Sequence, residues 1–223
     1  TAALAVEVML RAGLPADVIA LLPGRGESVG AALVADPRVA GVAFTGSTEV
    51  AAIIARTLAS RLPLVPLIAE TGGLNAMIAD SSALPEQVAA DALVSAFDSA
   101  GQRCSALRVL CVQRDIASRV VTLLQGAMDE ISVGDPADRA TDVGPVIDRE
   151  AQSALERHVD AMRELGFVRH RTPLPAACAN GRFVAPTLVA LDRLDRLAKE
   201  VFGPILHVVE WDAAGLDALV DTI

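Results

Sequence analysis

The strongest constraint on the fold is a regular alternation of short apolar runs with helix-like segments along the chain. Apolar runs at 39–44 and 64–69 enclose one helical segment, and runs at 74–79 and 107–113 enclose another at about 85–98. Strands that alternate with helices form parallel sheets, because a parallel connection needs a long crossover. The sequence therefore predicts an α/β fold with parallel strands.

The flanking regions complete this pattern. Further helices are predicted at 2–12, 27–35, 115–131 and 148–165, further strands at 18–22, 183–191 and 205–210, and irregular connections at 132–147 and 171–182. The pattern restarts after Gly72-Gly73, which indicates a crossing between two units. We therefore expect one domain over residues 1–70 and a second over residues 71–223.

Composition excludes several classes of function. The net charge is −9, with 28 acidic and 19 basic residues and no basic run, so a nucleic-acid partner is not expected. No apolar run reaches the roughly 18 residues that span a bilayer. Three cysteines without C-x-x-C spacing, in a chain without a signal peptide, predict a reducing compartment and a cytoplasmic protein. Thr1 and the helix-like last residues suggest an excerpt of a longer protein.

Cys104 in Gly-Gln-Arg-Cys-Ser is the candidate nucleophile. A cysteine in an apolar chain is often inert core, but glycine and polar neighbours here predict an exposed turn, and the Arg103 cation favours thiolate. Cys111 lies in an apolar run and is expected to be packing, and Cys178 is given no role. No histidine lies near Cys104 in the sequence.

Glu70 in Ala-Glu-Thr-Gly-Gly is the candidate general base. It follows an apolar strand, and ligands bind at the carboxyl ends of strands in open parallel sheets. A glutamate beside a thiol can activate the water that hydrolyses a thioester. The alternative is a solvated carboxylate at a strand end.

Gly46 and Ser47 lie where a strand turns into a helix, so free amides at the helix start can face a phosphate. Helix capping by Ser47 alone is the alternative. The segment matches neither G-x-G-x-x-G nor a P-loop. The three histidines lack metal-ligand spacing, and no metal site is predicted.

Six segments in register resemble the aldehyde dehydrogenase superfamily. They are Phe44-Thr-Gly-Ser-Thr-Glu, Glu70-Thr-Gly-Gly, Gly101-Gln-Arg-Cys, Asp142-Val-Gly-Pro, Phe183-x-x-Pro-Thr and Glu200-Val-Phe-Gly-Pro. The longer run from Ala96 to Leu110 looks like the glutamate-semialdehyde (pyrroline-5-carboxylate) dehydrogenase unit of the bifunctional proline utilization A family. The resemblance implies the C-terminal part of an NAD-binding, Rossmann-type domain over 1–70 and a catalytic domain over 71–223, truncated at both ends.

This resemblance also implies roles for individual residues. Cys104 would form a thiohemiacetal with the aldehyde and then a thioester, which Glu70 would help to hydrolyse. The cofactor-binding residues would be Gly46 and Ser47 at the pyrophosphate, Glu200 at the nicotinamide ribose and Phe202 beside the nicotinamide, and Ser105 would contact the substrate carboxylate. NAD is the implied cofactor, with FAD in a separate proline dehydrogenase domain of the parent chain, and a homo-oligomer is implied.

Two departures from the family pattern occur, at Ala51 and Leu74, and neither removes a reacting group. Family segments for the oxyanion-hole Asn, the adenine ribose and substrate closure are missing, so the fragment alone is predicted to be inactive. Three alternatives stay open: an aldehyde dehydrogenase of another substrate class, a cysteine hydrolase or acyltransferase, and a non-catalytic aldehyde-dehydrogenase-like module.

Overall fold

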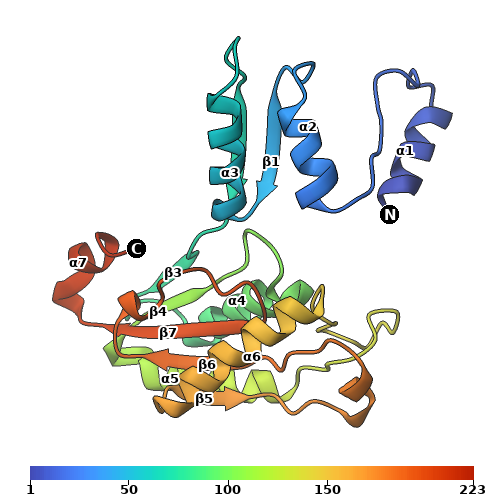
Figure 1. Cartoon of the computed structure of the whole chain (residues 1–223). Helices are drawn as coiled ribbons and strands as arrows, with labels where there is room; N and C mark the ends of the chain where they lie inside the picture. Colours follow the sequence, from blue (N-terminus) through green and yellow to red (C-terminus); the bar gives the residue numbers. More distant parts are fainter. The chain divides into compact units, whose positions relative to one another are not determined.

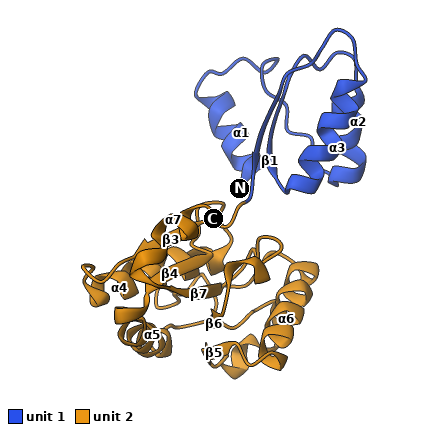
Figure 2. Ribbon diagram, turned by 90° about the vertical axis from the view of Figure 1, so that its left-hand side faces the viewer, with its two compact units in different colours: residues 1–72 blue, residues 73–223 orange.

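The chain divides into two compact units between Gly72 and Gly73 (Figure 1, Figure 2). The structure is a computed structural model that describes all 223 residues. No helix in it combines the length and the apolar character needed to cross a membrane. Each unit is α/β, as the alternating pattern predicts.

The first unit is built on a two-stranded parallel sheet. Strands β1 (Val42–Gly46) and β2 (Leu67–Thr71) are joined by the crossover helix α3 (Thr48–Ala59). Ala51, Ile54 and Leu58 form the buried stripe of α3 at helical spacing. The unit also contains α1 (Ala2–Arg11), the π-helical turn η1 (Gly26–Gly30) and α2 (Ala31–Ala35).

The strand predicted at 18–22 is wrong, because those residues have no regular structure. The apolar run lies between Pro15 and Pro23, and neither β1 nor β2 pairs with it. A short extended segment without a partner leaves its backbone donors and acceptors to water, so apolar character alone does not make it a strand.

The second unit contains a five-stranded sheet in the order β3-β4-β7-β6-β5. Its strands are β3 (Ala76–Ala79), β4 (Val109–Gln113), β5 (Val168–Arg171), β6 (Thr187–Leu191) and β7 (Ile205–Trp211). Its helices are α4 (Pro85–Phe97), α5 (Arg114–Asp129), α6 (Arg149–Glu164) and α7 (Leu216–Val220), with 3-10 turns η2 (Asp98–Gly101), η3 (Ala176–Asn180), η4 (Leu194–Arg196) and η5 (Ala213–Gly215). All neighbouring strands are parallel except β5 and β6.

Helices cover both faces of this sheet. The pair α4 and α5 lies on one face and α6 on the other (Figure 1, Figure 2). Every residue of β4 is buried, as expected for a central parallel strand, and Val120, Leu124 and Met128 of α5 are fully buried among the core residues. The unit therefore has one continuous hydrophobic core.

The elements of this unit follow the predictions with two differences. Strand β6 is shorter than the predicted 183–191, and β5 was not predicted. The sequence of β5 is Val-Arg-His-Arg, which lacks a strand-like apolar run. It is an edge strand bonded only to β6, where polar side chains are ordinary.

Candidate active site

The candidate nucleophile lies on a turn between η2 and β4, which we call the thiol turn (residues 101–105). Cys104 is a free and exposed cysteine on it. The backbone enters the turn through three consecutive residues in the left-handed region, Ser99 (φ 58°), Ala100 (φ 54°) and Gly101 (φ 64°). Such backbone costs free energy at residues with a Cβ and persists only where surrounding contacts stabilise it. The exposed thiol therefore follows a strained backbone segment that contacts with its surroundings must stabilise.

Gly101 is required by close packing as well as by its φ angle. A Cβ at this position would lie 2.2 Å from the carbonyl oxygen of Gly203 and 2.9 Å from that of Ala96. Only glycine allows this approach. The thiol turn therefore packs directly against the Glu200–Pro204 segment.

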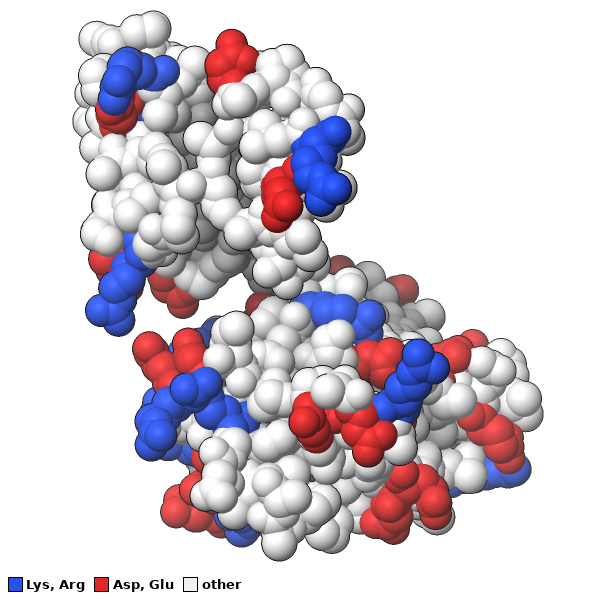
Figure 3. All heavy atoms as spheres, turned by 90° about the vertical axis from the view of Figure 1, so that its right-hand side faces the viewer, with Lys and Arg blue, Asp and Glu red and all other residues white.

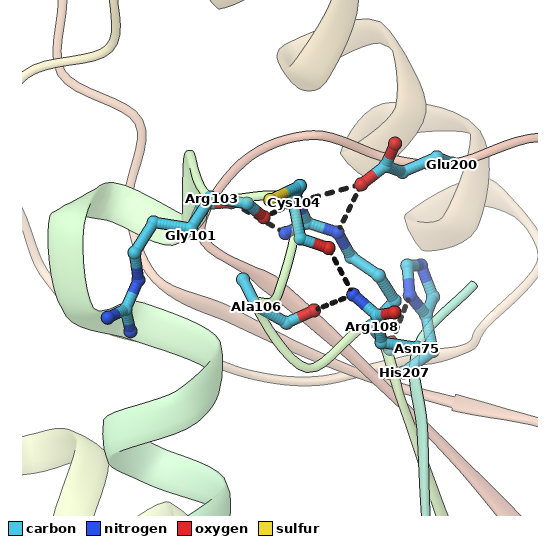
Figure 4. A network of polar contacts seen from close by, with 8 residues as sticks. All are labelled: Asn75, Gly101, Arg103, Cys104, Ala106, Arg108, Glu200 and His207. Atoms are coloured by element: carbon cyan, nitrogen blue, oxygen red, sulfur yellow. Dashed lines mark hydrogen bonds and ion pairs between the residues drawn. The ribbon is translucent and has the colours of Figure 1, made fainter. Parts of the chain in front are cut away.

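Asn75, just before β3, is hydrogen-bonded to the C-terminal end of the thiol turn. Its Nδ2 donates hydrogen bonds to the carbonyl oxygens of Cys104, at 2.6 Å, and Ala106, at 2.9 Å (Figure 4). Its own backbone carbonyl oxygen accepts from the backbone amides of Arg108 and Val109. One amide side chain thus fixes the Cys104 carbonyl relative to the sheet.

Arg108 lies beneath the thiol turn and is fully buried. Its Nη1 donates to the Gly101 carbonyl at 2.6 Å, and its Nη2 donates to the Arg103 carbonyl at 3.0 Å. Its Nε donates to Oε1 of Glu200 at 2.9 Å, and Nη2 is also 2.9 Å from this oxygen (Figure 4). Burial lowers the pKa of Arg108, and the hydrogen bond and the charge of Glu200 oppose that shift. The guanidinium therefore stays charged.

Glu200 and Phe202 lie on either side of this guanidinium. The Glu200 side chain is 17% exposed, and both contacts from Arg108 go to its Oε1. The Phe202 ring lies with its centroid 4.9 Å from Cζ of Arg108, in a cation–π contact, and is 44% exposed. Oε2 of Glu200 and the remaining ring surface are therefore available to a ligand.

A pair of histidines lies behind Arg108. His207 in β7 is fully buried, and its Nδ1 is 3.1 Å from the Arg108 carbonyl oxygen. Its Nε2 is 2.9 Å from Nε2 of His158 in α6. Burial and the neighbouring His158 lower the pKa of His207 to about 3, and burial lowers the pKa of His158. Both rings are therefore neutral near pH 7.

The other cysteines differ from Cys104 in their surroundings. Cys111 is fully buried in β4, and burial raises its pKa to about 11, so this thiol is unreactive. Cys178 is buried in η3, with its Sγ 3.6 Å from the Val133 carbonyl oxygen. Ser105, the candidate substrate contact, follows Cys104 and is exposed. Cys104 is therefore the accessible thiol of the chain.

The remaining predicted site residues lie in the first unit. Ser47 is the N-cap of α3 and its Oγ accepts from the Val50 amide at 3.2 Å, so it does act as a cap. Gly46 ends β1 opposite Thr71 of β2, and Glu70 is exposed opposite Thr45. The structure thus brings Gly46, Ser47 and Glu70 to one edge of the two-stranded sheet. Cys104, Ser105, Glu200 and Phe202 belong to the second unit.

No group of three or more His, Cys, Asp or Glu side chains converges as metal ligands would. Over the face in Figure 3, basic side chains lie mostly beside acidic ones. Ion pairs such as Arg119–Glu86 and Arg196–Asp192 join basic and acidic side chains in the second unit. Such mixed charge is typical of an ordinary solvated surface.

Three residues of this site were not found from the sequence: Asn75, Arg108 and His207. Arg108 could have been noticed, because it directly precedes an apolar run that is predicted to be a buried strand. Arginine is almost never fully buried without a partner, so its position predicts an ion pair. The sequence gives no indication for Asn75 and His207, because their roles depend on contacts with residues that are distant in the sequence.

The fold is α/β, and the second unit presents an exposed thiol on a turn that is hydrogen-bonded to a buried arginine, an arrangement that suits an enzyme with a cysteine nucleophile. Residues 1–218 match the family model described as "Aldehyde dehydrogenase family", and the chain belongs to this family.

The chain is similar to proline utilization A (PutA) proteins and to 1-pyrroline-5-carboxylate dehydrogenases. The "Bifunctional protein PutA" of Klebsiella aerogenes is 57% identical over the whole chain, which covers 18% of that protein. A crystal structure of a Bradyrhizobium japonicum proline utilization A (PutA) mutant superposes with a TM-score of 0.95 at 51% identity, over 100% of this chain and 22% of that one. The structure of 1-pyrroline-5-carboxylate dehydrogenase from Thermus with bound NAD superposes with a TM-score of 0.86 at 31% identity. The match covers 96% of this chain and 42% of that one. The chain thus spans about a fifth of the PutA proteins.

Proposed function

We propose that the protein containing this chain oxidises L-glutamate 5-semialdehyde, the open form of pyrroline-5-carboxylate, to L-glutamate with NAD. The observation that carries this proposal is an exposed Cys104 on a built turn in a chain that matches PutA from end to end at 57% identity. The names of the relatives support the substrate, and "bifunctional" supports a second, FAD-dependent proline dehydrogenase domain elsewhere in the protein.

In the first step, Sγ of Cys104 adds to the aldehyde carbon. A C–S bond forms, and the carbonyl oxygen becomes the oxyanion of a thiohemiacetal. Backbone N–H groups of the thiol turn stabilise that charge. The hydrogen bond from Asn75 to the Cys104 carbonyl keeps this backbone in place.

The residues present fit a nicotinamide cofactor. A bound nicotinamide would supply the acceptor for the hydride of the thiohemiacetal carbon. Oε2 of Glu200 is available to accept from a ribose hydroxyl, and the exposed ring surface of Phe202 suits the nicotinamide. Oγ of Ser47 accepts a hydrogen bond from the Val50 amide, and its hydroxyl hydrogen is free to be donated to a phosphate oxygen. The backbone amides at the start of α3 are further donors for that phosphate.

In the last step, Glu70 takes a proton from water as the water oxygen attacks the thioester carbon. The C–S bond breaks, Cys104 regains its thiolate, and the carboxylic acid that forms gives its remaining proton to solvent and leaves as a carboxylate. We propose that Ser105 contacts the α-carboxylate of the substrate during this cycle.

The first prediction concerns the two reacting residues in the full-length protein. Cys104→Ala is expected to lose at least about 10³-fold in NAD reduction with glutamate semialdehyde. Glu70→Gln is expected to release about one NADH per site in a burst and then turn over about 10²- to 10⁴-fold more slowly, because the thioester accumulates. Stopped-flow absorbance measures both.

Cys178→Ala is the matched control and is expected to keep wild-type turnover, because that thiol is buried in η3. A Cys104→Ala variant with wild-type activity would contradict the mechanism. A wild-type protein that prefers another aldehyde in a panel of semialdehydes would contradict the substrate, and one that reduces no NAD would favour a non-catalytic module.

A further inference from the structure

Arg108 is the side chain that joins the thiol turn to the Glu200 segment. It is fully buried, and it is paired to Glu200 although the two residues are 92 positions apart in the sequence. Its other hydrogen bonds go to the carbonyls of Gly101 and Arg103, on either side of Gln102. The hydrogen bonds of the guanidinium are therefore made to segments that carry a candidate nucleophile or cofactor residue.

The contact with the Arg103 carbonyl, which also accepts a hydrogen bond from the Ala106 amide, helps to hold the direction of a neighbouring donor. The carbonyl of Arg103 and the N–H of Cys104 belong to one planar, trans peptide unit, in which the two groups point in opposite directions. Because the Arg103 carbonyl points to the buried guanidinium, the Cys104 N–H points away from it. This N–H is a donor that the proposed mechanism uses for the oxyanion.

The same guanidinium also fixes the Glu200 carboxylate. Nε and Nη2 both contact Oε1, which leaves Oε2 on the side away from Arg108. Arginine has the planar array of donors that this needs, whereas lysine has a single compact charge. Burial requires partners for the donors of a guanidinium, and all three acceptors of Arg108 belong to the thiol turn or are Glu200 itself.

We propose that Arg108 is a positioning residue for the dehydrogenase reaction, and that it aligns two things at once: the Cys104 N–H through the Arg103 carbonyl, and the ribose-facing oxygen of Glu200. This proposal rests on the proposed function, in which Cys104 is the nucleophile and Glu200 contacts the cofactor. It predicts that substitution of Arg108 affects both kcat and the KM for NAD. The effect on kcat arises from the contact with the Arg103 carbonyl, and the effect on KM arises from the contact with Glu200.

The test uses Arg108→Met, Arg108→Lys, Glu200→Gln and Arg108→Met/Glu200→Gln in the full-length protein, with rates normalised to folded protein. Arg108→Met is expected to lower kcat about 10- to 100-fold, because small misplacements of reacting groups have effects of this size, and to raise the KM for NAD. Arg108→Lys keeps the charge beside Glu200, so it is expected to restore the KM for NAD more than kcat. In the Glu200→Gln background, Arg108→Met should lower kcat further with no further rise in KM.

Arg171→Met is the matched control. Arg171 pairs with Glu156 at 2.6 Å in the same unit, and its loss is expected to leave kcat and the KM for NAD unchanged. Wild-type kcat and KM in folded Arg108→Met would overturn the proposal, as would a loss of activity that disappears on normalisation to folded protein. If Arg108→Met does not fold, Arg108→Lys decides alone: its kcat must fall more than its KM rises.

A second measurement separates this proposal from the proposed function. Alkylation of Cys104 by iodoacetamide needs neither NAD nor aldehyde, and Arg108→Met is expected to slow it about tenfold as the turn loses its alignment. If the wild-type protein reduces no NAD, the proposed function fails, and unchanged alkylation in the Arg108 variants then also overturns the positioning role.

Discussion

At the scale of single residues, the packing of the thiol turn depends on the lack of a Cβ atom at Gly101. Its backbone lies at φ 64°, and its Cα faces the Gly203 carbonyl. Gly166, which follows α6, has a similar φ of 75°, but a Cβ added there would meet nothing within 4 Å. The two glycines therefore separate the cost of the φ angle from the cost of the close contact.

We predict that Gly101→Ala destabilises the second unit by about 2–5 kcal/mol, because left-handed strain of about 1–2 kcal/mol adds to an overpacking term of about 1–3 kcal/mol. Gly166→Ala is the control and should cost only the strain term. Urea unfolding measures both, with fluorescence of Trp211, the single tryptophan of the chain. Equal losses in the two variants would mean that the Gly203 contact is not formed.

The surroundings of single residues could be predicted where the neighbouring sequence determines them. Cys104 stands among glycine and polar neighbours, and its exposure follows from them. Ser47 stands at a strand-to-helix change, and its capping bond is present. Arg108 and Asn75 act through contacts with Glu200 and Ala106, and such pairs depend on the tertiary fold rather than on local pattern.

At the scale of elements, prediction depended on whether a segment makes its contacts within itself or with a neighbour. The long helices α5 and α6 carry their own apolar stripes, α6 is also capped by Asp148, and both form near the predicted residues. The segment 18–22 has the composition of a strand but no partner, and β5 has a partner in β6 but not the composition. Pairing, which the sequence does not display, decides both cases.

Helix α5 offers a test of intrinsic helix propensity. Gly126 lies in its last turns, and a Cβ there would meet nothing within 4 Å. We predict that Gly126→Ala stabilises the second unit by about 0.5–1 kcal/mol, because glycine loses more backbone entropy in a helix. A lower urea midpoint than wild type, again followed by Trp211, would contradict this prediction.

At the scale of the whole molecule, the hydrophobic core is concentrated in one unit. Every residue of the main buried cluster lies between Ala79 and Leu219. The first unit contributes three buried apolar side chains, all from α3. The sequence could not foresee this difference, because both units have similar apolar runs and burial depends on how many layers cover them.

The buried His207 makes the stability of the second unit depend on pH. Its pKa is about 3 in the folded protein and about 6.5 when unfolded. The unfolded state therefore binds more protons between these values, and stability is full above about pH 6.5 and falls as pH decreases below it. The groups that face His207 are His158 and Arg108, and neither offers a negative charge to an imidazolium.

We predict that the urea midpoint of the wild-type protein falls from about pH 7 to pH 5, with His207 contributing up to about 1.4 kcal/mol per pH unit. His207→Asn does not titrate and keeps a donor toward the Arg108 carbonyl, so its midpoint should change less with pH whatever its absolute stability. Parallel pH dependence in the two proteins would exclude His207 as the source.

The histidine pair also fixes where each proton resides. A carbonyl oxygen only accepts, so Nδ1 of His207 must bear the hydrogen that it shares with Arg108. Neutral His207 then has a bare Nε2, and the hydrogen in the 2.9 Å contact must belong to Nε2 of His158. The two rings are therefore opposite tautomers in a directional chain that runs from α6 through β7 to the backbone of Arg108.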